Sequence, residues 1–321
     1  MADLETISLT TEDGRTLAGS WFPAQGRAAH TVLVLNSGTG IPRGFYRRFA
    51  AFAASRGFGV LTYDYRGIGG SAPADLRKSA IQNREWGHYD IPAAIAWATQ
   101  RLPDVPLAVV GHSAGGQQLG LAHNVKRVDA ALFVAVSTGY WRDMPTGHKW
   151  FTWMLWNVFV PLSRATLGYF PARRFGLGEN LVSSTAAEWG SWCMEPTYMA
   201  AFFDGTGHRQ CLDGRPFGAV HFDEARFPIV TYCFGDDPIA TRATVPPMMR
   251  LYAEASIEDR WFEPAEVGAD IKEIGHLGFF REGAGKTLWA DALEQLRSNA
   301  SDFSSRRAPE RFQAVAQPSL A

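Results

Sequence analysis

The chain is poor in features that mark several protein classes. Its three cysteines, Cys193, Cys211 and Cys233, are scattered and form no C-x-x-C pair, which argues against a disulfide framework and a zinc site. No uninterrupted apolar stretch reaches the length of a membrane span. The formal net charge of the 321 residues is −1, so neither nucleic acid nor an anionic membrane is expected as a partner.

The N-terminus also lacks a visible targeting signal. Residues 1–5 offer neither a basic segment nor the beginning of an apolar one, so no secretory peptide is expected and a cytoplasmic location is the prediction. What is present is an ordinary globular composition, with 46% hydrophobic and 20% charged residues. A chain of this length can form one large α/β domain with an insertion.

Short apolar runs alternate with amphipathic stretches through most of the chain. A β-hairpin is expected over residues 7–22. Asp90 is expected to cap a helix that carries Pro92 in its first turn. The remaining strands are expected at residues 31–35, 60–63, 107–110, 130–136, 229–234 and around 261–262. This order predicts an α/β fold with a doubly wound, mostly parallel sheet and helices on both faces.

Residues 141–225 interrupt this alternation and are rich in tryptophan. We predict an inserted helical cap here, between core segments at 1–140 and 226–298. The stretch from Trp150 to Leu162 is apolar nearly all round and predicts a helix buried on several sides. Residues 299–321 are polar and predict a disordered tail. The tryptophans of the cap, which either line a pocket or build its core, are Trp141, Trp150, Trp153, Trp156, Trp189 and Trp192.

A short motif around Ser113 is the strongest functional signal. The residues before it are apolar and of strand type, and those after it are small and helix-forming. A side chain at either outer glycine would crowd the neighbouring backbone. The pattern is the G-x-S-x-G of a nucleophile elbow, a sharp turn that exposes a serine hydroxyl, and it reads Gly111-His112-Ser113-Ala114-Gly115.

Ser113 needs a base and an orienting acid, because a serine hydroxyl is a poor nucleophile at neutral pH. After an elbow serine, acid and base follow in that chain order, each in a loop behind a later strand. Asp236 and Asp237 follow one such strand, and His276 lies in a glycine-flanked loop beyond the last strand. We predict His276 as the base and Asp237 as the acid, since Pro238 fixes the backbone just after it. Asp236 stays open as the alternative.

Stabilising the reaction's negative charge requires an oxyanion hole of two backbone N–H groups. Ala114, directly after the serine, is expected to supply one of them. The second is expected from the small-residue loop at 36–40, where either Thr39 or Gly38 could be the donor.

These motifs together resemble the α/β-hydrolase superfamily over about residues 5–298. The run Asp64-Tyr65-Arg66-Gly67-Ile68-Gly69-Gly70-Ser71 accompanies the elbow in that superfamily, and we assign it a structural role. The chain departs from the superfamily at Asn36-Ser37, where a His-Gly usually precedes the oxyanion loop. It is also similar to a poorly characterised bacterial subgroup of hydrolases through Gly40-Ile41-Pro42, Phe45-Tyr46, residues 176–180, residues 189–193 and residues 275–280.

The resemblance implies a serine hydrolase, an esterase or related enzyme, that cleaves an ester, thioester or other acyl bond of a hydrophobic small molecule. No cofactor is expected, and no metal-ligand spacing is present. An acyltransferase with the same triad and a non-catalytic ligand-binding protein are the alternatives, and retention of both Ser113 and His276 favours an enzyme. The aromatics of the cap leave a homodimer contact open.

Overall fold

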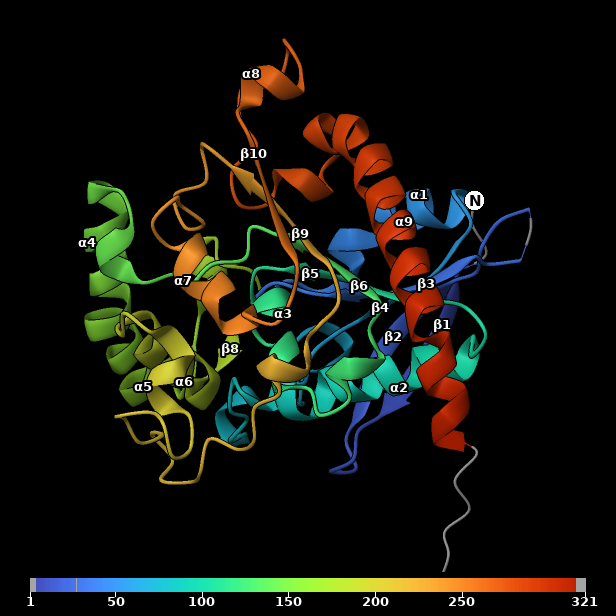
Figure 1. Ribbon diagram of the computed structural model, residues 1–321. Helices are drawn as coiled ribbons and strands as arrows, with labels where there is room; N and C mark the ends of the chain where they lie inside the picture. Colours follow the sequence, from blue (N-terminus) through green and yellow to red (C-terminus); the bar gives the residue numbers. More distant parts are fainter. Residues whose placement is uncertain (1–3, 27, 316–321) are drawn as a thin grey trace, which may run out of the picture.

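Eight strands form one sheet at the centre of the molecule (Figure 1). The computed structural model describes residues 4–26 and 28–315, with side chains to Arg306. The strand order is β1-β2-β4-β3-β5-β6-β9-β10. β2 runs antiparallel to both β1 and β4, and every other neighbouring pair in this sheet is parallel. The strands are β1 (Glu5–Thr10), β2 (Thr16–Phe22), β3 (Thr31–Asn36), β4 (Phe58–Tyr63), β5 (Leu107–His112), β6 (Ala130–Val134), β9 (Ile229–Phe234) and β10 (Ile257–Phe262).

The central strands lie where the sequence places its continuous apolar runs. Every residue of β3, β4, β5, β6 and β9 is buried, as expected for parallel strands covered on both faces. The predicted hairpin is also confirmed, because β1 pairs with β2 from Glu5 opposite Trp21 to Thr10 opposite Thr16.

Helices cover both faces of this sheet, which confirms the doubly wound arrangement. Figure 1 shows α1 and α2 on opposite sides of the strands. Phe49 of α1 packs against Trp289 of the last helix with ring centroids 5.7 Å apart. The helices outside the inserted segment are α1 (Arg47–Ser55), α2 (Ile91–Arg101), α3 (Ala114–Gln117), α7 (Val245–Met249), α8 (Pro264–Val267) and α9 (Glu282–Val315).

Asp90 does not cap α2 as the sequence predicted. A π-helical turn, Trp86–Asp90, leads directly into α2, and the Asp90 side chain makes no capping bond. Its carboxylate instead accepts hydrogen bonds from Nε of Arg66 at 2.7 Å and from the backbone N–H of Arg66 at 2.8 Å. The buried guanidinium is a stronger partner than a helix N–H, because charge-assisted hydrogen bonds exceed neutral ones.

Residues 141–225 contribute no strand to the eight-stranded sheet within the described chain. They form α4 (Thr146–Met154), α5 (Val160–Leu167), α6 (Ser183–Cys193) and a two-stranded ribbon of β7 (Tyr169–Phe170) and β8 (Leu181–Val182). A π-helical turn, Leu155–Phe159, joins α4 to α5. The predicted burial of this run on several sides is wrong, because Trp150 and Leu162 are each 58% exposed.

The predicted disordered tail at 299–321 is helical instead as far as Val315, where α9 ends. Ala300 is fully buried and Phe303 packs against the core, so tertiary contacts hold this part of the helix in place. Residues 316–321 lie outside the described residues. Among the helices of the described chain, none combines the length and the apolar character that crossing a membrane requires.

Candidate active site

Ser113 lies on a strained turn between β5 and α3. Its backbone has φ 48° and ψ −114°, a region that residues with a side chain seldom adopt and that occurs at functional sites. A Cβ at Gly111 would approach the backbone nitrogen and Cα of Gly116 to 2.7 Å, and one at Gly115 would collide with the carbonyl group of Asn36. The two outer glycines of the motif are therefore required by close backbone packing.

Asp237 lies against the imidazole of His276. Oδ2 of Asp237 is 2.7 Å from Nδ1 of His276, and Oδ1 accepts the backbone N–H groups of Ile239 at 2.8 Å and Ala240 at 3.1 Å. Because the carboxylate faces Nδ1, that nitrogen carries the proton and Nε2 is left as the acceptor. The arrangement orients the ring in the manner of a general base held by an acid.

Asp236 has a different environment. Its two carboxylate oxygens accept the backbone N–H groups of Ile274 at 2.7 Å and Gly275 at 3.0 Å. Of the two aspartates that the sequence left open, Asp237 is the one brought to the imidazole. Asp236 fixes the backbone of the loop that carries His276.

The charge of Asp237 is stabilised within the protein interior. Burial by itself raises the pKa of this carboxyl, but His276 and the two backbone N–H groups outweigh burial and hold the pKa below its ordinary value. Asp237 is therefore ionised over the neutral range.

The loop at 36–40, where the sequence predicts an oxyanion donor, has one N–H group that is already engaged and one that is free. The N–H of Gly38 donates to the hydroxyl of Tyr46 at 2.8 Å. This N–H group is therefore not free to act as the oxyanion donor, a role that the sequence left open between Gly38 and Thr39. Within the described chain, the N–H groups of Thr39 and Ala114 have no hydrogen-bond acceptor. Ala114 is the first residue of α3, where backbone N–H groups are unpaired by geometry.

His112 and Tyr46 form a hydrogen-bonded chain that the sequence did not reveal. Nε2 of His112 donates to the carbonyl oxygen of His276 at 2.9 Å, and its Nδ1 accepts from the Tyr46 hydroxyl at 2.8 Å. Burial lowers the pKa of His112 to about 3, with a further contribution from nearby His276, so its ring is neutral. The chain joins the oxyanion loop, the elbow and the His276 loop. Only the Phe45-Tyr46 resemblance pointed to this region.

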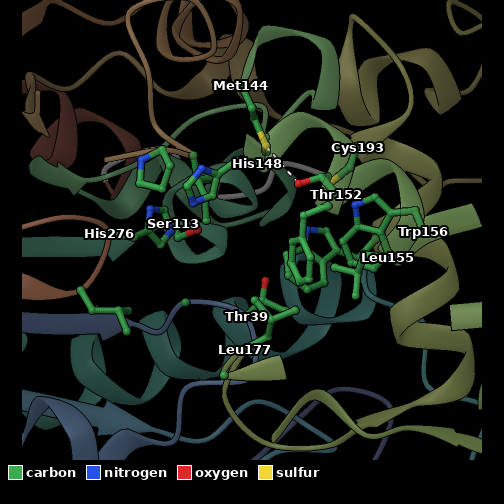
Figure 2. A pocket seen from close by; sticks show the side chains of 18 of the residues that line it. Thr39, Ser113, Met144, His148, Thr152, Leu155, Trp156, Leu177, Cys193 and His276 are labelled. Atoms are coloured by element: carbon green, nitrogen blue, oxygen red, sulfur yellow. Dashed lines mark hydrogen bonds between the residues drawn. The ribbon is translucent and has the colours of Figure 1, made fainter. Parts of the chain in front are cut away.

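A cavity of about 500 Å³ lies between these loops and the inserted segment (Figure 2). Ser113 and His276 occupy the same end of it in this view, with Trp156 and Leu155 toward the other end. Further lining residues come from the loop at 36–40, from α4, from the connection between β7 and β8, and from α6, and include Thr39, Phe151, Thr152, Leu177, Trp189 and Cys193. The inserted segment thus supplies most of an apolar wall facing the serine.

The described part of the chain holds no group of three or more histidine, cysteine or acidic side chains placed to share a metal ion. All three cysteines are free. The chemistry that the cavity supports rests on the serine, the imidazole, the carboxylate and the backbone N–H groups around it.

Comparison with known sequences gives partial matches. The family described as serine aminopeptidase, S33, matches residues 27–175. An uncharacterized protein of Mycobacterium tuberculosis, found in strain H37Rv and again in strain CDC 1551 / Oshkosh, is 30% identical over 175 residues. The match covers 52% of this chain and 54% of that protein, so the chain spans about half the length of the curated relatives it matches.

Solved structures match over nearly the whole chain at low sequence identity. The Pyrococcus furiosus esterase Pf2001 aligns with a TM-score of 0.55 at 15% identity, covering 93% of this chain and 94% of the esterase. The hypothetical protein PA2218 of Pseudomonas aeruginosa aligns with a TM-score of 0.58 at 15% identity, covering 91% of this chain and 94% of that protein. A bacterial brefeldin A esterase aligns with a TM-score of 0.54 at 15% identity, covering 94% of this chain and 78% of the esterase. The strand order, the sharp turn at Ser113 and the aligned solved structures agree that the chain has the α/β-hydrolase fold.

Proposed function

We propose that the chain is a serine hydrolase that cleaves an ester, thioester or related acyl bond of a hydrophobic small molecule. The observation that carries this proposal is the 2.7 Å contact between Asp237 and His276 at the end of the cavity that Ser113 lines. An imidazole oriented in this way, at the same end of the cavity as the elbow serine, supports a role in nucleophilic catalysis.

In the proposed reaction Ser113 attacks the substrate carbonyl carbon while Nε2 of His276 takes the hydroxyl proton. The tetrahedral intermediate places its oxyanion between the free N–H groups of Ala114 and Thr39. His276 then returns the proton to the leaving alcohol or thiol, and a water molecule repeats the sequence to release the acid. Asp237 steadies the imidazolium in both halves and stays ionised.

The lining of the cavity supports a neutral, hydrophobic substrate. No aspartate, glutamate, lysine or arginine is among the described residues that line it. An aminopeptidase has to bind a protonated α-amino group, which calls for a carboxylate in the site. An apolar acyl or alkyl group instead gains free energy from leaving water against Leu155, Trp156 and Leu177.

The test is hydrolysis of p-nitrophenyl esters of graded acyl length by the full chain. We expect kcat/KM to rise by about fourfold per added methylene until the acyl group fills the cavity. Leu177→Trp, which reduces the cavity, should shorten the preferred acyl chain. Absence of turnover across the esters and the matching thioesters, with the protein folded, would contradict the proposal.

A further inference from the structure

The helical run from Thr146 to Leu167 is apolar on two opposite sides. Its inner side carries Leu155, Trp156 and Val160, which are buried. Its outer side carries large side chains that remain exposed, and we call them the outer stripe: Trp150, Trp153, Met154, Val158 and Leu162.

The outer stripe is continuous along the helix. Trp150, Met154, Val158 and Leu162 follow one another at intervals of four residues, and Trp153 lies beside Met154. An interval of four places side chains on one helical face. Figure 1 shows α4 and α5 at the edge of the molecule, on the other side of the view from α9. A run of exposed tryptophan, methionine and leucine of this kind marks a surface that binds something apolar.

The helix that carries the outer stripe also forms one wall of the cavity. Phe151 and His148 line the cavity and are both exposed, Phe151 by 41%. The cavity therefore opens beside the outer stripe. A second copy of the chain lying flat on this face would cover that opening, whereas a lipid surface would supply apolar molecules to it.

The charge around the outer stripe differs from that of the whole chain. Residues 141–175 contain five basic residues and one acidic residue, Asp143, while the whole chain has a net charge of −1. Arg173 pairs with Glu179 at 2.9 Å. The other four have no carboxylate partner within the residues the structure describes. The five are Arg142, Lys149, Arg164, Arg173 and Arg174.

Exposed tryptophans together with basic side chains that lack a carboxylate partner are the composition of helices that lie in a membrane interface. We propose that the outer stripe docks on the surface of a bilayer containing anionic phospholipids. Trp150, Trp153 and Leu162 enter the boundary between headgroups and acyl chains, and the basic side chains contact lipid phosphates. An apolar substrate then passes from the bilayer to the cavity beside Phe151.

The experiment measures co-sedimentation of the full chain with phosphatidylcholine vesicles, with and without phosphatidylglycerol. It uses the Ser113→Ala background, so that docking is read independently of hydrolysis. We expect strong binding only with phosphatidylglycerol, weakened by high salt. Trp150→Ser combined with Leu162→Ser should lower the partition coefficient by about tenfold or more, because two large side chains no longer leave water.

Leu212→Ser is the matched control, because Leu212 is 60% exposed, comparable to Leu162, but lies outside the helix. It should leave vesicle binding unchanged. Sedimentation of the parent Ser113→Ala protein that does not depend on vesicles would overturn the proposal, as would an equal loss of binding in the control. Sedimentation equilibrium tests whether the outer stripe binds a second copy of the chain instead. A dimer that Trp150→Ser dissociates, together with no binding to vesicles, would show that the outer stripe is a dimer contact and would overturn lipid docking. Because vesicle binding is measured without catalysis, it tests lipid docking even if the protein hydrolyses none of the esters.

Discussion

His112 donates a hydrogen bond from Nε2 to the backbone carbonyl oxygen of His276 at 2.9 Å. The residue just before the proposed nucleophile therefore supports the loop that carries the proposed base. Tyr46 extends this contact to Gly38 in the oxyanion loop. Three loops that are distant in sequence are thus held in register by two buried side chains.

Tyr46→Phe should lower kcat more than it changes KM. Without the hydroxyl, the N–H of Gly38 loses its acceptor and Nδ1 of His112 loses its donor. The loss of these two hydrogen bonds should lower kcat by about tenfold to hundredfold. Steady-state kinetics on an ester substrate measures the effect. Tyr65→Phe is the control, because Tyr65 is equally buried but lies outside this chain of bonds. Equal kcat values for Tyr46→Phe and the wild type would refute the positioning role.

The buried His112 should make stability depend on pH. Its pKa falls from 6.5 to about 3 on folding, chiefly through burial. Between these two values the unfolded chain binds a proton that the folded chain does not. The free energy of unfolding should therefore decrease as pH falls through this window, by up to about 1.4 kcal/mol per pH unit.

Urea denaturation of the wild type and of His112→Gln across this window measures the difference. The variant should show the smaller slope. His88, whose burial lowers its pKa to about 4, is present in both proteins, so the comparison isolates His112. If the free energy of unfolding depended on pH equally in the two proteins, His112 would have the same pKa in the folded and unfolded chain, which would contradict this prediction.

Asparagine substitutions at the two neighbouring aspartates should have very different effects on kcat. Asp237→Asn replaces the carboxylate that orients His276 and should lower kcat by about a thousandfold to ten-thousandfold. Asp236→Asn disturbs only the backbone bonds to Ile274 and Gly275 and should lower kcat by less than about tenfold. Intact thermal unfolding of both variants would exclude misfolding, and a larger defect in Asp236→Asn would reassign the acid.

Arg66 should be essential for stability and not for the chemistry. Its guanidinium is almost fully buried and bonds to Asp90 at 2.7 Å, Asp13 at 2.8 Å and Glu85 at 3.0 Å. Burial raises the pKa of Asp90 to about 7 even beside the guanidinium. Arg66→Met removes the charged partner of this buried carboxyl and the bonds to Asp13 and Glu85, and should destabilise the fold by about 3–5 kcal/mol. Chemical denaturation measures the loss.

The exposed ion pair of Arg77 with Asp75 is the control for this prediction. It has a similar distance, 2.9 Å, but exposed pairs are screened by water. Arg77→Met should leave the denaturation midpoint unchanged. An equally small effect of Arg66→Met would mean that the run from Asp64 to Ser71 has no structural role of the kind inferred from the sequence.

Much of the fold could be predicted because local pattern and tertiary environment agree. The strand at residues 31–35 is a continuous apolar run and is buried on both faces. The elbow could be found because its glycines are required by backbone contacts at Gly116 and Asn36. Features of this kind are encoded within a few residues of where they act.

The sequence could not settle features that depend on distant contacts. Asp236 and Asp237 are adjacent and chemically identical, and only the position of the His276 loop distinguishes them. Gly38 and Thr39 differ in their available N–H groups because Tyr46 reaches one of them. Residues 299–306 are polar, but burial of Ala300 and packing of Phe303 keep them helical.

The claim on which the account depends is that Ser113 is the nucleophile. A fluorophosphonate probe reacts covalently with a serine that a base activates, and mass spectrometry of the digested protein locates the adduct. We expect one adduct, on Ser113, and no labelling of a folded Ser113→Ala variant. Labelling of that variant at the wild-type rate, or an adduct on another residue, would contradict the account.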